Sequence, residues 1–411
     1  MKKFLFIRPD ALGDAVLTLP VIFALKQQVK DAEVSWLGKD YLNALFPQRK
    51  PIDNFTDRID RPYDHSLHFV NEPRYAWQAY LKRIPHRVGY GDQWPLALLY
   101  NHKLPAPSFF EHQIERNLAF LKPLKINSRD FSYPPNLLTT TPSKKYIGFV
   151  IAQADSQAKY WTTRGFARLA ELIDHKLQMK VALFGAEREP AQKILKLYSN
   201  NVVDLTGQIP LGRLPEELSR CHLVVSGDTG LMHLACALKV PVVAIFTNKD
   251  HKPLRWGPTN TEHLILHNPQ VCKKHCVHAQ CRDFVCAEVI SAEEVLSAAQ
   301  KILGGNGIKN ERAAFINRAR LSINVLTFNA AIAENLKRAG IHCFLADRKT
   351  DLIRFIIEND INILQATPTP HLLWTKFRIE NIRGEKMLIY KDPPPRGTLE
   401  EIIDHYAGNK S

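Results

Sequence analysis

The stretch at residues 224–246, VVSGDTGLMHLACALKVPVVAIF, constrains the fold of this 411-residue chain more than any other. It contains the end of an apolar strand, a turn with two glycines, a helix with apolar residues at helical spacing, and a second apolar strand. Two buried strands joined through one helix are typical of a βαβ unit with a parallel sheet. We therefore predict an α/β fold organised around this unit.

The turn of this unit, SGDTG at residues 226–230, has the features of an anion-binding site. Its backbone N–H groups and the positive end of the helix dipole converge on one place, which suits a phosphate. Gly230 lets a ligand approach the backbone, and His233 lies one helical turn after Thr229. The alternative is that Asp228 only caps an ordinary helix. Capping does not account for the Asp-Thr-Gly-x-x-His combination, so we interpret the turn as a ligand site.

A second polar loop follows the first predicted strand, at residues 3–7, and precedes a predicted helix at residues 15–29 with a break at Pro20. Loops at the carboxyl edge of an open α/β sheet are where such sheets bind ligands. In this loop Gly13 permits a close approach, and we expect Asp14 to point from the helix start into the site. The alternative is that Asp14 only caps the helix.

Composition permits two or three domains and favours an anionic partner. The chain is 45% hydrophobic and 23% charged, with a formal net charge of +14. Such a charge attracts nucleic acid, an anionic membrane surface or a phosphorylated substrate, or it only marks a solvated basic surface. Because the Lys and Arg residues are scattered along the sequence, a nucleic-acid partner has no specific support.

The sequence contains neither a recognisable signal peptide nor a membrane span. The start, MKKFLFIRPD, has only a short apolar run, which Arg8 and Asp10 interrupt. No apolar run approaches the roughly 18 residues of a transmembrane helix. Seven cysteines, an odd number, fit a reducing compartment. We expect a cytoplasmic protein that can lie peripherally on the inner face of the inner membrane.

A linker rich in Pro, Thr and Ser at residues 132–145 divides the chain into two α/β regions. Further strands are predicted at residues 33–37, 63–69, 146–151, 180–184 and 202–207, and helices at residues 164–176 and 214–220. A Gly-Gly pair at residues 304–305 marks a second break. Beyond it, strands are predicted at residues 322–328, 341–345 and 361–365 and helices at residues 330–338 and 350–358, about half of a Rossmann-like domain.

The stretch at residues 224–246 resembles the nucleotide-sugar signature of the ADP-heptose:lipopolysaccharide heptosyltransferases, glycosyltransferase family 9. The motif RPDALGDAVLTLP at residues 8–20 resembles the N-terminal pattern of that family, and ISAEEV at residues 290–295 resembles one of its helices. Weaker matches in the same order are HRVGY at residues 86–90, the H-x-x-x-R pattern at residues 112–116, and WGP at residues 256–258. The resemblance covers residues 1 to about 304.

The resemblance implies the GT-B fold, in which two Rossmann-like doubly wound domains face a cleft. Residues 1–140 would form the acceptor-binding domain and residues 141–304 the nucleotide-sugar-binding domain. A small C-terminal α/β appendage of unknown role would follow at residues 305–411. The implied reaction is inverting, metal-independent transfer of a heptose from ADP-heptose to the lipopolysaccharide inner core, with a lipid A-linked acceptor and no cofactor.

The resemblance also implies roles for individual residues. Asp14 matches the proposed catalytic base, with Asp10 as the competing carboxylate in the same loop. Lys159 matches a lysine that contacts the nucleotide diphosphate, and Glu189 matches a position that can bind the ribose. The alternatives are a surface lysine beside a buried Trp161 and an ordinary exposed glutamate. Rival functions are a transferase of the same family with another sugar or acceptor, and a non-catalytic nucleotide-sugar-binding protein.

Four cysteines, Cys272, Cys276, Cys281 and Cys286, follow a C-x3-C-x4-C-x4-C pattern with two interleaved histidines. Four thiolates in so short a span could hold a structural zinc ion, although the spacing is not that of a common zinc ribbon. The family carries a similar segment that its chemistry does not use. We therefore expect a structural cluster, with no catalytic metal and no disulfides.

Overall fold

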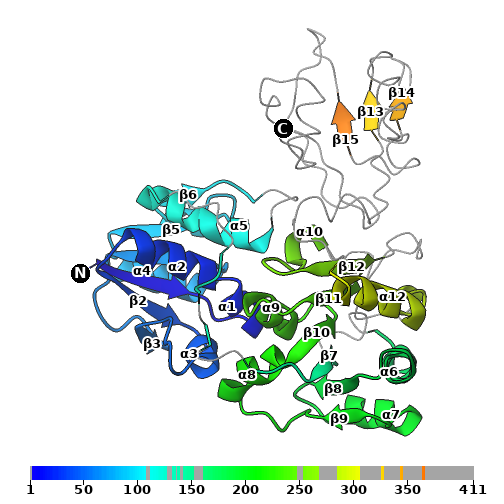
Figure 1. The fold of residues 1–411 in the computed structure, drawn as a ribbon. Coiled ribbons are helices and arrows are strands. Elements are labelled where there is room, and N and C mark those ends of the chain that lie inside the picture. The colour runs from blue at the N-terminus through cyan, green and yellow to red at the C-terminus, as the bar shows by residue number, and fades with distance from the viewer. Residues whose placement is uncertain are drawn as a thin grey trace. The chain divides into compact units, whose positions relative to one another are not determined.

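The computed structural model describes residues 2–107, 112–126, 132–135, 137–138, 142–151, 161–247, 253–267 and 285–305, together with residues 325–327, 343–345 and 363–365. These residues fall into two compact units. The first unit contains all described residues up to 305, and the second contains three short strands. Figure 1 shows both units and labels elements of each where there is room.

The first sheet of unit 1 is parallel, with the strand order β3-β2-β1-β4-β5-β6. Its strands are β1 (Lys2–Ile7), β2 (Ala32–Leu37), β3 (Asn54–Thr56), β4 (His65–His68), β5 (His86–Tyr90) and β6 (His102–Leu104). Its helices are α1 (Leu12–Val16), α2 (Leu19–Gln28), α3 (Tyr41–Leu45), α4 (Pro73–Leu81) and α5 (Gln113–Leu118), with 3₁₀ turns η1 (Leu96–Leu99) and η2 (Ala119–Leu124). This doubly wound order places a topological switch point between β1 and β4.

The second sheet repeats the same order, β12-β11-β10-β7-β8-β9. Its strands are β7 (Tyr146–Val150), β8 (Lys180–Phe184), β9 (Val202–Asp204), β10 (Cys221–Ser226), β11 (Val242–Phe246) and β12 (His263–His267). Its helical segments are α6 (Thr163–Leu177), α7 (Glu189–Leu197), η4 (Leu211–Arg213), α8 (Leu214–Ser219), α9 (Gly230–Ala237), α10 (Pro253–Trp256), α11 (Val285–Glu288) and α12 (Ala292–Leu303). The switch point lies between β7 and β10, so the predicted pair of Rossmann-like doubly wound sheets is confirmed.

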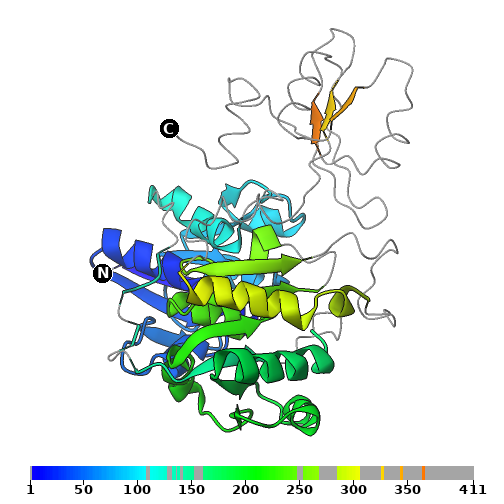
Figure 2. The same ribbon diagram turned by 45° about the vertical axis from the view of Figure 1, so that its right-hand side comes forward.

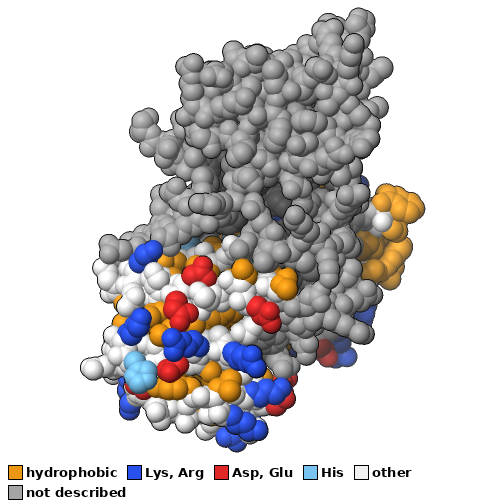
Figure 3. All heavy atoms as spheres, turned by 90° about the vertical axis from the view of Figure 1, so that its right-hand side faces the viewer, with side chains coloured by type: hydrophobic (Ala, Val, Ile, Leu, Met, Phe, Trp, Pro, Cys, Tyr) orange, Lys and Arg blue, Asp and Glu red, His pale blue; other side chains and the backbone are white. Residues whose placement is uncertain are grey.

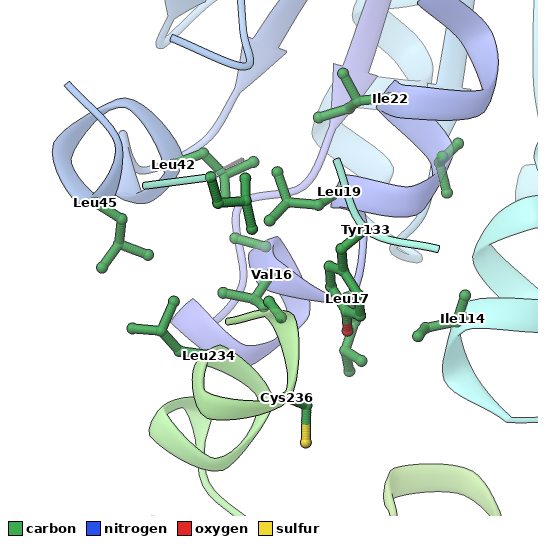
Figure 4. Packing of buried hydrophobic residues seen from close by; sticks show 14 of the residues in the cluster. Val16, Leu17, Leu19, Ile22, Leu42, Leu45, Ile114, Tyr133, Leu234 and Cys236 are labelled. Atoms are coloured by element: carbon green, nitrogen blue, oxygen red, sulfur yellow. The ribbon is translucent and has the colours of Figure 1, made fainter. Parts of the chain in front are cut away.

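Both sheets are held by apolar strands that helices cover. Strands such as β11, with the sequence VVAIF, are buried along their whole length, as parallel strands in α/β proteins are. One apolar cluster packs α6 and α12 against the second sheet, and Figure 2 shows α12 lying across its strands. A larger apolar cluster runs from the first sheet to the second through α1 and α9. In Figure 4, Val16 of α1 lies over Leu234 and Cys236 of α9.

The predicted single helix at residues 15–29 is two helices. The first, α1, begins three residues earlier, at Leu12, and ends at Val16, and α2 begins at Leu19 with Pro20 in its first turn. The predicted break at Pro20 is thus confirmed. Proline is tolerated in the first turn of a helix because its missing N–H has no intrahelical acceptor there.

A buried histidine ties the region of the first sheet to the region of the second. Nδ1 of His112, at the start of α5, accepts a hydrogen bond from the Ile114 N–H at 3.2 Å. The neutral ring therefore carries its hydrogen on Nε2, which donates to the Gly257 carbonyl at 3.1 Å, 145 residues further along the chain. Protonating Nδ1 would turn this acceptor into a donor that faces another donor.

Unit 2 contains a parallel sheet with the order β14-β13-β15, formed by β13 (Val325–Thr327), β14 (Cys343–Leu345) and β15 (Ile363–Gln365). The three strands predicted beyond residue 305 are therefore confirmed. The helices predicted at residues 330–338 and 350–358 lie outside the described residues. The division into functional domains at residues 140 and 304 stays a prediction. No helix in the described part of the chain is long and apolar enough to cross a membrane.

Acid should destabilise unit 1. Burial lowers the pKa of both His68 and His112 to about 3, and for His112 the Gly257 carbonyl opposes that shift only in part. The unfolded value is about 6.5, so between these two values the unfolded chain binds more protons than the folded chain. The free energy of unfolding should therefore fall as the pH drops from about 6.5 towards 3, by up to about 1.4 kcal/mol per pH unit for each histidine. Urea denaturation at a series of pH values measures this slope.

The variant His68→Phe provides the internal comparison. It removes one titrating ring from the core without touching the contact between the two sheet regions, so the slope should become shallower. A wild-type unfolding free energy that does not change between neutral and mildly acidic pH would contradict the interpretation.

Candidate active site

The two loops that the sequence predicts as ligand sites meet each other. Helix α1 follows β1 and helix α9 follows β10, and in each sheet that strand borders the switch point. A Cβ atom added to Gly13 would lie 3.2 Å from Gly230 Cα and 3.2 Å from His233 Cδ2. A Cβ atom added to Gly230 would lie 3.0 Å from the Gly13 nitrogen. Both positions need glycine because the two helix starts approach backbone to backbone.

Asp14 does not cap the helix that contains it. It is the third residue of α1, whose N-cap is Ala11 without a side-chain hydrogen bond. Instead, Asp14 Oδ1 accepts a hydrogen bond from Arg8 Nη2 at 2.9 Å. The Arg8 side chain is almost fully buried, whereas that of Asp14 is 22% exposed. The capping alternative for Asp14 is therefore wrong, and its carboxylate is oriented by a buried guanidinium.

Arg8 also holds the competing carboxylate. Its Nε lies 3.5 Å from Asp10 Oδ1, and its Nη1 donates to the Phe69 carbonyl, just after β4, at 3.4 Å. Arg8 thus joins both sides of the first switch point. Burial raises the pKa of Asp10, and the charge of Asp14 adds to this, while Arg8 opposes it. Two carboxylates with different surroundings therefore lie beside one guanidinium.

At the start of α9, Thr229 is the N-cap. Its side chain accepts from the Met232 N–H at 3.3 Å and lies 3.1 Å from Ser226 Oγ. The alternative in which Asp228 caps the helix is therefore wrong. Asp228 Oδ1 instead lies 3.6 Å from Nε2 of His233, whose side chain is almost fully buried. The N–H groups of the first turn of an α-helix have no intrahelical acceptor, so this turn can bind an anion.

Two arginines to which the sequence analysis assigned no role, Arg116 and Arg255, join the same region. Arg255 of α10 donates from Nε to Gln113 Oε1 at 2.9 Å, and its guanidinium lies 4.5 Å from the centre of the Trp256 ring. Burial lowers the pKa of Arg255 to about 10, with Arg116 adding to the shift and Asp14 opposing it. The group is still charged at neutral pH.

Arg8, Arg116 and Arg255 therefore act electrostatically on one place, together with the carboxylates of Asp10 and Asp14. These guanidinium groups offer charged hydrogen-bond donors to an anionic ligand. A signal for Arg116 was present, because it is the arginine of the H-x-x-x-R match. Arg255 lies directly before the W-G-P match, but its partner Gln113 is 142 residues away in sequence.

The remaining predicted binding residues are less closely defined. Lys159 lies outside the described residues, and Trp161, which ends the same loop, donates its Nε1–H to the Ile290 carbonyl at 2.8 Å. Glu189 begins α7 and pairs with Lys193 at 2.7 Å on the surface. Because β10, β7 and β8 are neighbours in a parallel sheet, the carboxyl ends of these strands lie at one edge. The roles of Lys159 and Glu189 stay predictions.

The structure does not test the zinc hypothesis. Cys272, Cys276 and Cys281 lie outside the described residues, and Cys286 is buried in α11. Within the described ranges, no group of three or more His, Cys, Asp or Glu side chains could hold a metal ion.

Residues 55–284 match the model of glycosyltransferase family 9 (heptosyltransferase). Lipooligosaccharide heptosyltransferase 2 of Campylobacter jejuni is 24% identical over 331 residues, which cover 74% of this chain and 98% of the relative. The solved family 9 glycosyltransferase of Veillonella parvula superposes with a TM-score of 0.60 at 20% identity, covering 74% and 97% of the two chains. The ADP-heptose lipopolysaccharide heptosyltransferase II of Escherichia coli gives a TM-score of 0.59 at 20% identity, covering 74% and 99%. These structures confirm the predicted GT-B fold.

Substituting Gly13 by alanine should disturb the site more than the fold. The added methyl group would meet the Gly230 backbone and push α1 from α9, and overpacking of this kind costs about 1–3 kcal/mol. Alanine recovers roughly 0.5–1 kcal/mol of that by favouring the helix. A displacement of about 1 Å at reacting groups can cost about 10²-fold in rate, so activity should fall far more than the melting temperature.

Gly91→Ala is the matched control, because its methyl group would meet Lys103 Cβ at the same 3.2 Å, on β5–β6 rather than between α1 and α9. It should leave activity near the wild-type value. Equal activity of Gly13→Ala and wild type would show that the close contact is not needed.

Proposed function

Because this chain belongs to glycosyltransferase family 9, the heptosyltransferases, we propose that it transfers a heptose from ADP-heptose to the inner core of lipopolysaccharide. Family membership identifies the chain as a glycosyltransferase. The identity of its donor, the identity of its acceptor and the stereochemistry of the transfer are what we propose. The observation that carries it is the contact of α1 with α9, because it brings a carboxylate on one sheet beside an anion-binding helix start on the other. An enzyme that joins an acceptor hydroxyl to a nucleotide sugar needs both groups at one place.

In the proposed reaction Asp14 is the general base. It accepts the proton of the acceptor hydroxyl while that oxygen forms a bond to the anomeric carbon of the heptose. The bond from the anomeric carbon to the diphosphate oxygen breaks, and its electron pair leaves with ADP. Attack from the face opposite the leaving group inverts the anomeric centre. Arg8 keeps the Asp14 carboxylate oriented throughout.

The donor site is proposed at the start of α9. Gly230 and Thr229 supply backbone N–H groups and the helix dipole to the diphosphate, and His233 and Asp228 shape the turn beside it. The charge of the leaving ADP is further offset by Lys159 and, at the junction, by Arg255. Glu189 accepts hydrogen bonds from the ribose hydroxyls. In this scheme the positive charge comes from the protein, so no divalent cation is needed.

We further propose that the enzyme works in the cytoplasm at the inner face of the inner membrane. A net charge of +14 would hold it near anionic headgroups and the acidic sugars of a lipid A-linked acceptor.

The direct test of the proposed transfer is incubation with ADP-heptose and heptose-deficient lipopolysaccharide, read by mass spectrometry. A gain of one heptose mass supports the proposal. ADP binding without transfer to any acceptor would favour the non-catalytic alternative, and transfer from a different nucleotide sugar would identify another donor.

Asp14→Asn should abolish most turnover and keep the fold. Asparagine can still accept the hydrogen bond from Arg8 but cannot take the proton, so kcat should fall by roughly 10²–10⁴-fold. Asp14 does not cap α1, so no helix cap is lost. ADP affinity, measured by calorimetry, should change little because the diphosphate site lies on α9.

Asp10→Asn is the matched comparison in the same loop, since Asp10 is held by the same arginine. It should lower kcat far less. Near-normal turnover of Asp14→Asn together with an inactive Asp10→Asn would mean that Asp10 is the base.

Arg255→Met should weaken ADP binding by about 1.5–3 kcal/mol, the usual contribution of a hydrogen bond to a charged group. Methionine keeps much of the side-chain volume but removes the charge. Gln113→Met is the control, because it removes the hydrogen bond to Arg255 and leaves the guanidinium in place.

If protein cations replace a metal, turnover should also persist in excess EDTA. Turnover that stops with EDTA and returns with a divalent cation would contradict the proposed metal independence.

A further inference from the structure

Helix α4 has its small residues inside and its large aromatic residues outside. Ala76 and Ala79 are fully buried against the rest of the unit, whereas Trp77, Tyr80 and Leu81 are exposed, Leu81 to 70%. Amphipathic helices of globular proteins normally bury their large apolar side chains. Trp77, Tyr80 and Leu81 therefore contribute little apolar burial to the stability of the fold. Their exposure indicates a role other than stabilising the fold.

The neighbouring 3₁₀ turn η1 packs against α4 and also exposes large apolar side chains. Its inward residues Leu96 and Leu99 join Ala76 of α4 in one small buried cluster, which holds the two elements together. Its outward residue Leu98 is exposed, and Trp94, two residues before η1, is 80% exposed. We call Trp77, Tyr80, Leu81, Trp94 and Leu98 the aromatic patch. They are five of the ten large hydrophobic side chains that are exposed among the described residues.

The segment that carries the aromatic patch is mostly basic. Residues 72–107 contain five Lys or Arg residues and two acidic residues, Glu72 and Asp92. Lys82 and Arg83 are exposed directly after α4, and the Arg87 guanidinium lies 5.5 Å from the centre of the Tyr80 ring. The face drawn in Figure 3 is different, because there basic and acidic side chains alternate. Surface pairs such as Arg168–Glu171 and Lys193–Glu189, on α6 and α7, show the same mixing.

We propose that the aromatic patch docks the enzyme on the surface of an anionic phospholipid bilayer. Trp and Tyr rings are well suited to the headgroup region, where one side of the ring is apolar and the other wet. Lysine and arginine beside them pair with lipid phosphates. The proposal rests on the proposed function, because a lipid A-linked acceptor is presented at a membrane, and it assigns the membrane contact to α4 and η1.

A second copy of the chain fits this surface less well than a bilayer. A two-fold interface brings the same patch of both copies together, so each copy would add its own excess of Lys and Arg to one interface. Like charges at close range are repulsive. An anionic lipid surface supplies the opposite charge over the whole patch.

The test uses the full-length protein and vesicles that contain no lipopolysaccharide. Sedimentation with phosphatidylglycerol-containing vesicles should show binding that weakens with salt, and pure phosphatidylcholine vesicles should bind far less. Trp77→Ser/Trp94→Ser should lower the partition coefficient by at least about tenfold, because two interfacial rings are lost. Lys82→Gln/Arg83→Gln should lower it by roughly fivefold for each charge removed. Leu197→Ser on α7 is the matched control, since Leu197 is 57% exposed outside the patch, and it should bind like wild type.

Transfer to a soluble, deacylated acceptor separates this proposal from the proposed function. The patch variants should keep that transfer at the wild-type rate and lose transfer only to acceptor embedded in vesicles. Vesicle binding requires neither the nucleotide-sugar donor nor the transfer reaction. It can therefore be measured even if the proposed donor or acceptor is wrong. Quenching of wild-type Trp fluorescence by brominated phosphatidylglycerol gives a reading without any variant.

Patch variants that bind vesicles like wild type, or wild-type Trp fluorescence that brominated lipid does not quench, would overturn the assignment. A change from dimer to monomer in the patch variants, seen in analytical ultracentrifugation without loss of vesicle binding, would also overturn it and would make a second copy the occupant.

Discussion

The backbone contact between Gly13 and Gly230 is the constraint on which the candidate site depends. Each glycine lies in the first turn of a helix that follows a strand at the switch point of its own sheet, and a single methyl group on either would meet the backbone of the other helix. Around this contact the apolar side chains of α1 and α9 form one continuous cluster, so the two sheets are packed together there. The polar groups of both loops are thereby held at fixed distances, which is what a two-substrate reaction requires.

The charged groups around that contact are arranged so that the most deeply buried one has partners of opposite charge. Arg8 is placed among apolar residues at the end of β1 and is accompanied by two carboxylates, which is how a buried charge is tolerated. Arg116 and Arg255 bring further positive charge from α5 and α10. The hydrogen bond from His112 to Gly257 links the two elements that carry these arginines.

The sequence predicts most of the fold because the buried strands are continuous apolar runs, and local chemistry marks several helix starts. Thr162, for example, caps α6, accepting from the Gly165 N–H. Helix α4 was not predicted, because its inward side chains are alanines and its large side chains face out. The capping alternatives for Asp14 and Asp228 were wrong since α1 begins earlier than its apolar pattern indicates and Thr229 reaches the Met232 N–H instead. Arg255 could not be assigned because its role depends on residues more than a hundred positions away.

The position of the glycine contact also bears on how the two halves can move. When two bodies rotate about a point of contact, each atom moves in proportion to its distance from that point. Here the pivot lies beside Asp14 and the start of α9, so a rotation of a few degrees would barely alter the spacing of these groups. The same rotation would displace the outer strands β3 and β6 against β9 and β12 by much more. The contact of α3 with η4 and the hydrogen bond from His112 to Gly257 oppose such a rotation, so the two halves are held at more than this one point.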